Sequence, residues 1–441
     1  MAYSGGYGEG YAAGVPAAPD FYDWFPTVTV DVAFSTAVDA VGYLILDDPI
    51  RGKLNTGTLG ADYFDDVSQY VERASTSRGS GRFDGVYARA EAGRATVVFN
   101  NTDRRFDPTN LAGPYVSAGE TEIEPMRTFR IMAEWAGTVY HLWRGYADEW
   151  RLDWTSLAKT TLTGTDGTKV VSNYDSVAGG LVGSGETTGA RINRVLDNAG
   201  WSAVDRVVDT GLTTVQSTDL SSNAWTEILL TSDTEIGETY FDAQNRLVFR
   251  DRHAVLTDTR STTPQAVFGC DPAELGYDAV EIVNDDTQVR NIIRISRVGG
   301  TVQTAEDAAS QVKYLRKTWG RSDLIMQTDT EAADYAAYVL SFSKDAELRF
   351  ASLRVVPTTD PTNLWPQVLG RELGDRITVK FTPPGGGAII QRDSFIRGIK
   401  HDIGAATWVT TWTLQDADTF LSFLVLDHVS LGRLNSNSLA Y

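Results

Sequence analysis

The chain has 441 residues, of which 42% are hydrophobic and 22% are charged. This length predicts roughly two to four domains, and the composition is typical of globular proteins with sizeable cores. The formal net charge of −19 argues against a nucleic acid as the main partner, because binding to phosphates requires cationic side chains. No apolar run approaches about 18 residues, so no stable membrane insertion is expected.

The first 26 residues are rich in Gly, Ala, Tyr and Pro and show no periodicity, which predicts a flexible N-terminal arm over 1–26. The aromatic residues of this arm leave two possibilities open: it becomes ordered on a partner, or it remains a disordered tail. The arm has no basic start and no apolar core, so no signal peptide is expected.

Cysteine and histidine are scarce. Cys270 is the only cysteine, and the four histidines lie far apart in sequence. This spacing predicts no internal disulfide and no zinc site. The chain also has no Walker motif, and no dinucleotide fingerprint follows a predicted strand. We therefore expect no metal and no cofactor.

From residue 27 to 172 the pattern is nearly all β, with turns spaced as in a barrel or sandwich. Ala136 and Gly137 form the predicted turn of a hairpin. The predicted strands cover residues 27–34, 40–47, 64–73, 85–92, 94–99, 128–133, 139–146, 150–154 and 159–163. This segment is interpreted as a first β-barrel-like domain.

The pattern changes at about residue 173, where a glycine-rich segment begins. Apolar faces and capping residues predict helices over 189–198 and 224–234, followed by a hairpin over 240–252. Together these elements predict a small α/β domain over 173–272.

Residues 273–371 are predicted to form an α+β domain, and residues 372–420 a second β-barrel-like unit. An Ala-rich helix is expected over 330–344, beginning at Thr330. The predicted strands cover residues 277–283, 289–298, 348–356, 373–381, 389–402 and 408–414. The fold class is therefore mainly β and multi-domain (α+β), with two β-barrel-like domains flanking a small α/β region.

Three motifs resemble minor tail proteins of siphophages, especially those of actinobacterial hosts. They are NxxRRFDP at 101–108, PMR at 125–127 and LWRGYADEW at 142–150. The segments LGDRITVKF, FIRGIKHDI and WVTTWTL are similar to the C-terminal barrel of the tail-hub family. A helix followed by TYFDAQNRLVFRDR is similar to the small α/β domain of hub proteins. The resemblance covers most of residues 40–415.

The resemblance implies a structural component of the virion tail tip, or baseplate hub, that is made in the host cytoplasm. Such a protein would join the tail tube to the tip complex and form part of the DNA conduit. It is expected to be a trimer, whose barrels form a pseudo-six-fold ring. The implied partners are the distal tail ring protein, the tape-measure protein and other minor tail proteins, with DNA only in transit. The net negative charge then has two interpretations: solubility, or an acidic lumen that repels passing DNA.

The first motif is interpreted as a structural turn. Its residues are Asp103, Arg104, Arg105, Phe106, Asp107 and Pro108. The charged residues fit a buried or interfacial network, and they fit a surface turn equally well. The sequence leaves this choice open.

Residues 44–59 and 424–439 form an internal repeat, LILDDPIRGKLNTGTL and LVLDHVSLGRLNSNSL, which aligns without gaps. The identical positions are Leu44, Leu46, Asp47, Gly52, Leu54, Asn55 and Leu59 in the first copy and Leu424, Leu426, Asp427, Gly432, Leu434, Asn435 and Leu439 in the second. The repeat is either shared turn chemistry or a pair of partner-docking segments. Under the second hypothesis, residues 421–441 form a C-terminal docking tail, and a trimer offers two docking motifs per chain to a six-fold tube.

Two other functions were weighed. A glycoside hydrolase needs two carboxylates about 5–10 Å apart. Candidate acids and sugar-stacking tryptophans are Glu134, Asp148, Glu149, Trp135, Trp143 and Trp150. However, acidic residues occupy 58 of 441 positions, so nearby pairs are expected by chance, and no catalytic motif is present. We therefore expect that the protein is not an enzyme. The alternative to the structural role is that it is an adhesin, a tail protein that recognises its receptor by binding carbohydrate of the host wall.

Overall fold

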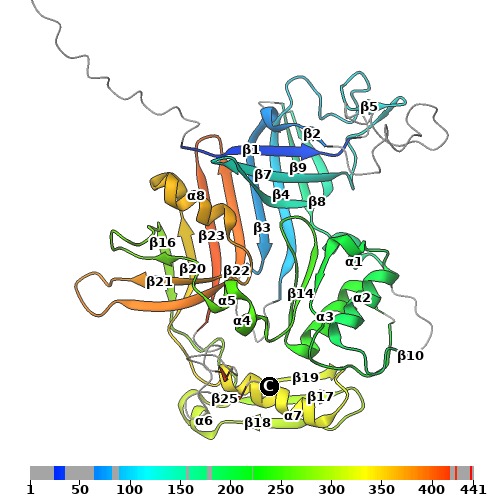
Figure 1. Ribbon diagram of the computed structural model, residues 1–441. Coiled ribbons are helices and arrows are strands. Elements are labelled where there is room, and N and C mark those ends of the chain that lie inside the picture. Colours follow the sequence, from blue (N-terminus) through cyan, green and yellow to red (C-terminus); the bar gives the residue numbers. More distant parts are fainter. Residues whose placement is uncertain are drawn as a thin grey trace, which may run out of the picture.

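The computed structural model describes residues 24–34, 64–81, 89–154, 158–175, 181–220 and 222–417, and the backbone of 423–424 and 438–439 (Figure 1). Most of the predicted N-terminal arm, the strand predicted at 40–47 and the first copy of the repeat lie outside these residues.

A 13-stranded sheet dominates the fold, and its strands follow one path of neighbours. In order, these are β16 (Ala279–Val283), β20 (Arg349–Val355), β23 (Trp408–Asp416), β22 (Ile390–Gly404), β3 (Val71–Gly79), β4 (Glu91–Asn100), β9 (Lys159–Thr165), β8 (Thr138–Asp153), β7 (Thr128–Trp135), β1 (Thr27–Val32) and β2 (Asp65–Asp66). Off this path, β21 (Arg376–Phe381) pairs with β22, and β15 (Val267–Phe268) pairs with β21. The mainly β fold class is confirmed.

The two predicted β units meet within this one sheet. Strand β3 pairs antiparallel with β22, from Gly79 opposite Gly398 to Arg73 opposite Gly404. At Gly79, whose φ is +79°, the chain has no room for a side chain. A Cβ atom there would lie 2.3 Å from the carbonyl oxygen of Arg397. Among the described strands the path does not return to its start, so barrel closure is not observed in that part of the chain.

Several predicted strands have different bounds in the structure; for example, β4 (Glu91–Asn100) is one strand where two were predicted, at 85–92 and 94–99. The pair predicted at 139–146 and 150–154 is the single strand β8, which continues through a bulge next to Ala147. The strand predicted at 64–73 is divided between β2, a 3₁₀ turn at Ser68–Tyr70 and the start of β3. The division arises because Val30 bonds the Val67 amide and the Ser68 hydroxyl at 2.9 and 2.8 Å, which turns the chain there.

Helix α8 (Pro361–Gly370) packs beside the sheet near β7, β8 and β23 (Figure 1). Its Trp365 is fully buried, with ring centroids 5.9 Å from Trp135, 5.0 Å from Trp408 and 5.4 Å from Phe25. Trp135 belongs to the first β unit and Trp408 to the second. Trp365 therefore packs against both units, and burying a large aromatic ring stabilises by roughly 2–3 kcal/mol.

A small α/β unit follows the first β unit. Its sheet has the order β11 (Arg206–Val208), β14 (Leu247–Arg250) and β13 (Glu238–Phe241). Helices α2 (Thr188–Asn198) and α3 (Ala224–Glu235) cover one face (Figure 1). They match the predicted helices, because Thr187 and Asn223 cap them by accepting main-chain N–H bonds of 3.3 and 2.9 Å.

A third unit consists of α7 (Asp329–Ser343) packed on a sheet with the order β18 (Gln303–Glu306), β17 (Ile292–Arg297) and β19 (Thr318–Leu324). In Figure 1 it lies at the opposite end of the molecule from β1. The cap of α7 is Thr328, not Thr330, because Thr328 and Glu331 form a reciprocal capping box.

The remaining elements are short. They are α1 (Thr168–Ser172), α4 (Ala254–Thr257), α5 (Thr259–Thr262), α6 (Ala308–Tyr314), β5 (Val116–Ser117), β6 (Glu120–Thr121), β10 (Leu181–Val182), β12 (Thr218–Asp219), β24 (Phe423–Leu424), β25 (Ser438–Leu439) and 3₁₀ turns at Ala203–Asp205 and Pro357–Thr359. Among the helices of the described residues, none has the length and apolar character needed to cross a bilayer.

Candidate functional site

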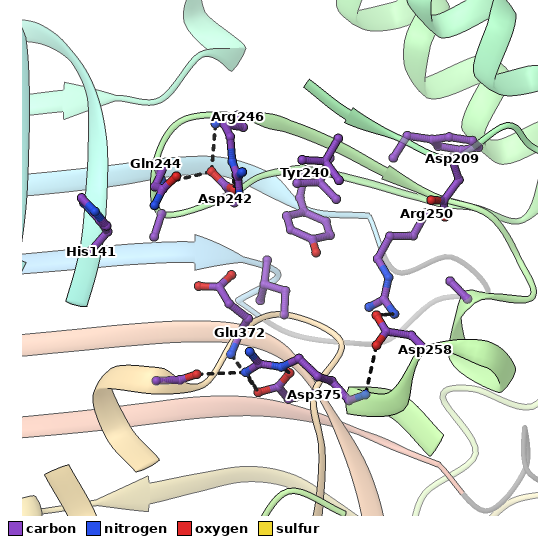
Figure 2. Close-up of a pocket in the computed structure, with 18 of the residues that line it drawn as sticks. His141, Asp209, Tyr240, Asp242, Gln244, Arg246, Arg250, Asp258, Glu372 and Asp375 are labelled. Atoms are coloured by element: carbon purple, nitrogen blue, oxygen red, sulfur yellow. Dashed lines mark hydrogen bonds and ion pairs between the residues drawn. The ribbon is translucent and has the colours of Figure 1, made fainter. Parts of the chain in front are cut away.

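A cavity of about 810 Å³ opens where three parts of the molecule meet (Figure 2). We call it the junction cavity. One wall is the small sheet β11–β14–β13, and a second is the start of β8 around His141. The third wall consists of α4, α5 and the connection from α8 to β21, residues 369–375. Cavities of this size at a junction between domains are common ligand sites.

Strand alternation explains which side chains reach the cavity. In β14, Leu247 and Phe249 pack in the core of the α/β unit, whereas the side chains of Val248 and Arg250 lie on the opposite face and line the cavity, which Phe249 also borders. Successive side chains of a strand point to opposite faces. The same rule places Tyr240 of β13 in the cavity and its neighbour Phe241 against the helices.

Ion pairs connect segments that are remote in sequence around this cavity. Arg78 of β3 donates two bonds to Glu372, of 3.0 and 2.6 Å. The Arg78 side chain is only 5% exposed. Burial alone would lower the pKa of Arg78, but the neighbouring carboxylate of Glu372 outweighs it and raises that pKa. The pair is therefore a fixed, charged contact between the main sheet and residues 369–375.

Two more pairs hold the lower wall. Arg250 donates to Asp258 at 2.9 Å and to the Ser261 hydroxyl at 3.1 Å. Arg260 forms an ion pair with the buried carboxylate of Asp375. Burial opposes the charged state of Arg250, yet nearby acidic groups, Glu238 foremost, raise its pKa. These contacts attach α4 and α5 to the start of β21.

Tyr240 differs from these paired groups. It is only 9% exposed, and its hydroxyl points into the open centre of the cavity (Figure 2). No residue of the described ranges forms a hydrogen bond with that hydroxyl. Burial raises the pKa of Tyr240, so the phenol stays protonated at neutral pH. His141 at the opposite wall is also neutral, because burial and the charge of Arg130 lower its pKa.

The chemistry of the junction cavity is that of polar recognition. Glu372, Asp258 and Asp375 each form an ion pair with an arginine. Over the part of the chain that the structure describes, no three His, Cys, Asp or Glu side chains are grouped so that they could hold a metal ion.

The sequence-predicted turn lies at the far end of the first β unit. Phe106 is fully buried, its ring centroid is 4.5 Å from that of Phe99 and 6.0 Å from that of Trp150, and its amide donates to Asn101 Oδ1 at 2.9 Å. The guanidinium of Arg105 lies 3.6 Å from the Tyr70 ring centroid. The run thus places one aromatic anchor in the core.

Charged neighbours close this turn. Arg104, with a φ of +58°, donates to Asp107 Oδ2 at 2.9 and 2.7 Å, and Arg105 donates to Asp103 at 2.7 Å. Burial opposes ionisation of Asp107, but bonds from Thr109 and Arg104 outweigh it and lower its pKa. Pro108 follows, half-buried. The network is partly buried and local, and the described contacts remain within the motif and its immediate surroundings.

The predicted docking residues are mostly outside the described residues. Only the backbones of Leu424 and Leu439 are described, in β24 and β25, where they stand opposite each other in a parallel pair. The first and last positions of the second repeat copy therefore meet in space.

The tryptophans considered for sugar stacking are packed within the β units, whereas the candidate acids Glu134 and Glu149 are exposed. Trp143 is 1% exposed, Trp135 packs on Trp365, and Trp150 donates its indole N–H to the Glu124 carbonyl at 2.9 Å. Asp148 bonds Lys169 at 2.6 Å and Thr165 at 2.6 Å. These tryptophans are packed into the protein instead of forming an open stacking surface.

Sequence reasoning missed the junction cavity. Its ion pairs join residues far apart in the chain, such as Arg78 and Glu372 with a separation of 294 positions. One local signal was available: Gly374, in the LGD run, has a φ of +86°, and a Cβ atom there would lie 1.9 Å from the Arg250 guanidinium. A glycine required by a close approach marks such a site.

The chain was compared with known proteins. No protein-family model matches it, and no curated protein sequence matches it. Among solved structures, the 43 kDa tail protein of prophage MuSo2 from Shewanella oneidensis matches with a TM-score of 0.54 at 12% identity, over 89% of this chain and 98% of that one. The tail protein from Neisseria meningitidis MC58 matches with a TM-score of 0.54 at 11% identity, over 89% and 97% of the two chains. The chain therefore has the fold of these phage and prophage-type tail proteins, as the resemblance predicted, whereas the siphophage origin stays a prediction.

Proposed function

We propose that the protein is a structural component of a phage tail tip, a baseplate-hub subunit that joins the tail tube to the tip complex and forms part of the DNA conduit. The observation that carries the proposal is the extent of the fold match, which spans 89% of this chain and 97–98% of each tail protein. A match over the full length of both proteins supports a shared architecture more strongly than one shared module would. The step from fold to function is an analogy.

The composition and the ion pairs are consistent with this role. A net charge of −19 disfavours stable DNA binding and suits a wall past which DNA moves. Four of the six carboxylates that line the junction cavity are in ion pairs with arginines, which is consistent with a structural role. The proposed assembly is a trimer that contacts the distal tail ring and the tape-measure protein.

We further propose that the internal repeat docks onto a neighbouring tail ring. In the second copy, Leu424 and Leu439, at the two ends of the motif, stand opposite each other. Deleting residues 420–441 should therefore prevent co-purification with the neighbouring ring while leaving the circular dichroism spectrum and the melting transition of the rest intact. Normal assembly of the truncated protein would contradict the docking role.

Labelling of virions tests the location and the assembly. Antibodies against the protein, attached to gold particles, should decorate the tail tip in electron micrographs. Light scattering of the purified protein, alone and co-expressed with neighbouring tail proteins, should give the mass of a trimer in at least one condition. Gold absent from the tip would overturn the proposed role. A monomer in every condition that binds host-wall polysaccharide would instead favour the adhesin.

A further inference from the structure

One polar group of the junction cavity has no hydrogen-bond partner among the residues that the structure describes. The Tyr240 hydroxyl points into it (Figure 2), while the residue as a whole is 9% exposed. Because the hydroxyl faces the open cavity, it can donate one hydrogen bond and accept another. A group kept this way at the centre of a cavity of about 810 Å³ is available to a ligand.

The charges of the lining restrict the chemistry of that ligand. Four lining carboxylates are already in ion pairs with arginines; these are Asp242, Asp258, Glu372 and Asp375. The other two, Asp209 and Asp251, each accept a main-chain N–H, at 3.0 and 2.9 Å. Carboxylates outnumber the lining guanidiniums, so an anionic ligand is disfavoured. The lone pairs that remain on these oxygens can accept bonds from neutral hydroxyl groups.

The main chain of the walls is largely occupied. Gly374 donates its N–H to Ile396 at 2.8 Å and accepts from Ser261 at 2.9 Å. The Gly370 carbonyl accepts from Arg260 at 2.9 Å, and the Asp209 amide donates to Phe249 at 3.0 Å. These main-chain groups are therefore not available to a ligand.

Apolar surface lies beside these polar groups. Tyr140, Val248 and Leu373 line the same cavity, and Val139 and Val207 at its walls are 53% and 42% exposed. A ring with hydroxyls at its edge and C–H groups on its face matches this mixture. The required ligand thus donates and accepts hydrogen bonds, carries no negative charge and has an apolar face.

We propose that the junction cavity binds a neutral saccharide, whose hydroxyls bond Tyr240, Glu372 and Arg250. The site is independent of the assembly role proposed above, because it involves no residue of the internal repeat. It would give a structural tail protein a carbohydrate-recognition function of its own.

Saturation-transfer NMR on the purified full chain tests the proposal. The probes are glucose, galactose, arabinose, N-acetylglucosamine and chitobiose, each at millimolar concentration. At least one should receive magnetisation from the wild-type protein. Tyr240→Phe removes only the hydroxyl. It should weaken the binding of that probe roughly twofold to tenfold, which is the effect of losing one hydrogen bond. Gln244→Ala, at the exposed rim of the cavity, should weaken it as well without a risk to folding.

Two controls make the result decisive. Tyr174→Phe changes a tyrosine that is 37% exposed and lies outside the cavity lining, and it should bind like the wild type. Binding of a neutral ligand should not change between about 0.05 and 0.5 M salt. The proposal is overturned if no probe binds, or if Tyr240→Phe and Gln244→Ala both bind as well as Tyr174→Phe. If no saccharide binds but hexalysine does, and its binding is lost at high salt, the cavity is a site for a basic peptide instead.

Discussion

The ion pair between Arg78 and Glu372 gives the sharpest test of how the β units are held to the rest of the molecule. Glu372→Gln would keep the shape of the side chain and remove its charge. Arg78 would then remain charged at 5% side-chain exposure, with its bidentate partner gone. Removing one partner of a buried pair typically costs about 3–5 kcal/mol.

The exposure of Glu372 reduces this figure. Its side chain is 34% exposed, so water screens part of the interaction, and the glutamine oxygen can still accept one bond from Arg78. We therefore expect the free energy of unfolding to fall by about 2–3 kcal/mol. The double variant Arg78→Met, Glu372→Gln has no buried charge, so it should recover at least half of that loss.

Urea unfolding measures both variants. Fluorescence follows the environment of the 11 tryptophans, and circular dichroism follows the sheets. If the two unfolding curves coincide, a single free energy of unfolding describes the transition. Asp402→Asn is the matched control, because its pair with Lys400 is exposed on both sides, 47% and 56%; it should change stability by less than about 0.5 kcal/mol. If the double variant were as unstable as Glu372→Gln alone, an unpaired Arg78 would not be the cause.

Three further outcomes are expected. Phe106→Ala, at a fully buried ring, should cost about 3–5 kcal/mol in urea unfolding, whereas Leu111→Ala, 60% exposed, should cost less than about 0.5 kcal/mol; similar losses would contradict the anchoring role. Burial raises the pKa of Asp166 from 3.8 to about 6, so its stabilising contribution is complete below about pH 3.8 and lost as the pH rises through about 6; Asp166→Asn should flatten the unfolding free energy over that window, and an unchanged slope would refute the shift. Hydrogen exchange should open the amides of β3 and β22 in one step, and separate exchange of the two strands would refute a continuous sheet.

Much of the local structure was predictable from the sequence. The helices at 189–198 and 224–234 have caps and apolar faces, and the structure places α2 and α3 there. The hairpin at 240–252 contains β13 and β14. Each of these signals lies within about a dozen neighbouring residues, where periodicity and capping determine the outcome. The mainly β class follows from the same kind of signal.

Other features depend on contacts that no local pattern encodes. Helix α8 was not predicted. Pro366 lies inside it, and proline disfavours a helix interior. Tertiary packing of Trp365 outweighs this preference. The pairing of β3 with β22 joins Gly79 to Gly398, and no alternation within either strand identifies its partner. The candidate site was missed for the same reason, since its walls come from four separated segments.

The boundary between the two β units is stabilised by interactions of three different kinds. Main-chain hydrogen bonds join β3 to β22, the Trp365 ring packs against Trp135 on one side and Trp408 on the other, and Arg78 binds Glu372. A rotation of one unit against the other would break a ladder, open an aromatic core and expose a buried charge together. Their costs would add, because the three contacts involve different residues. The β units should therefore behave as one rigid body, and the junction cavity at their edge should keep a fixed shape for the same reason.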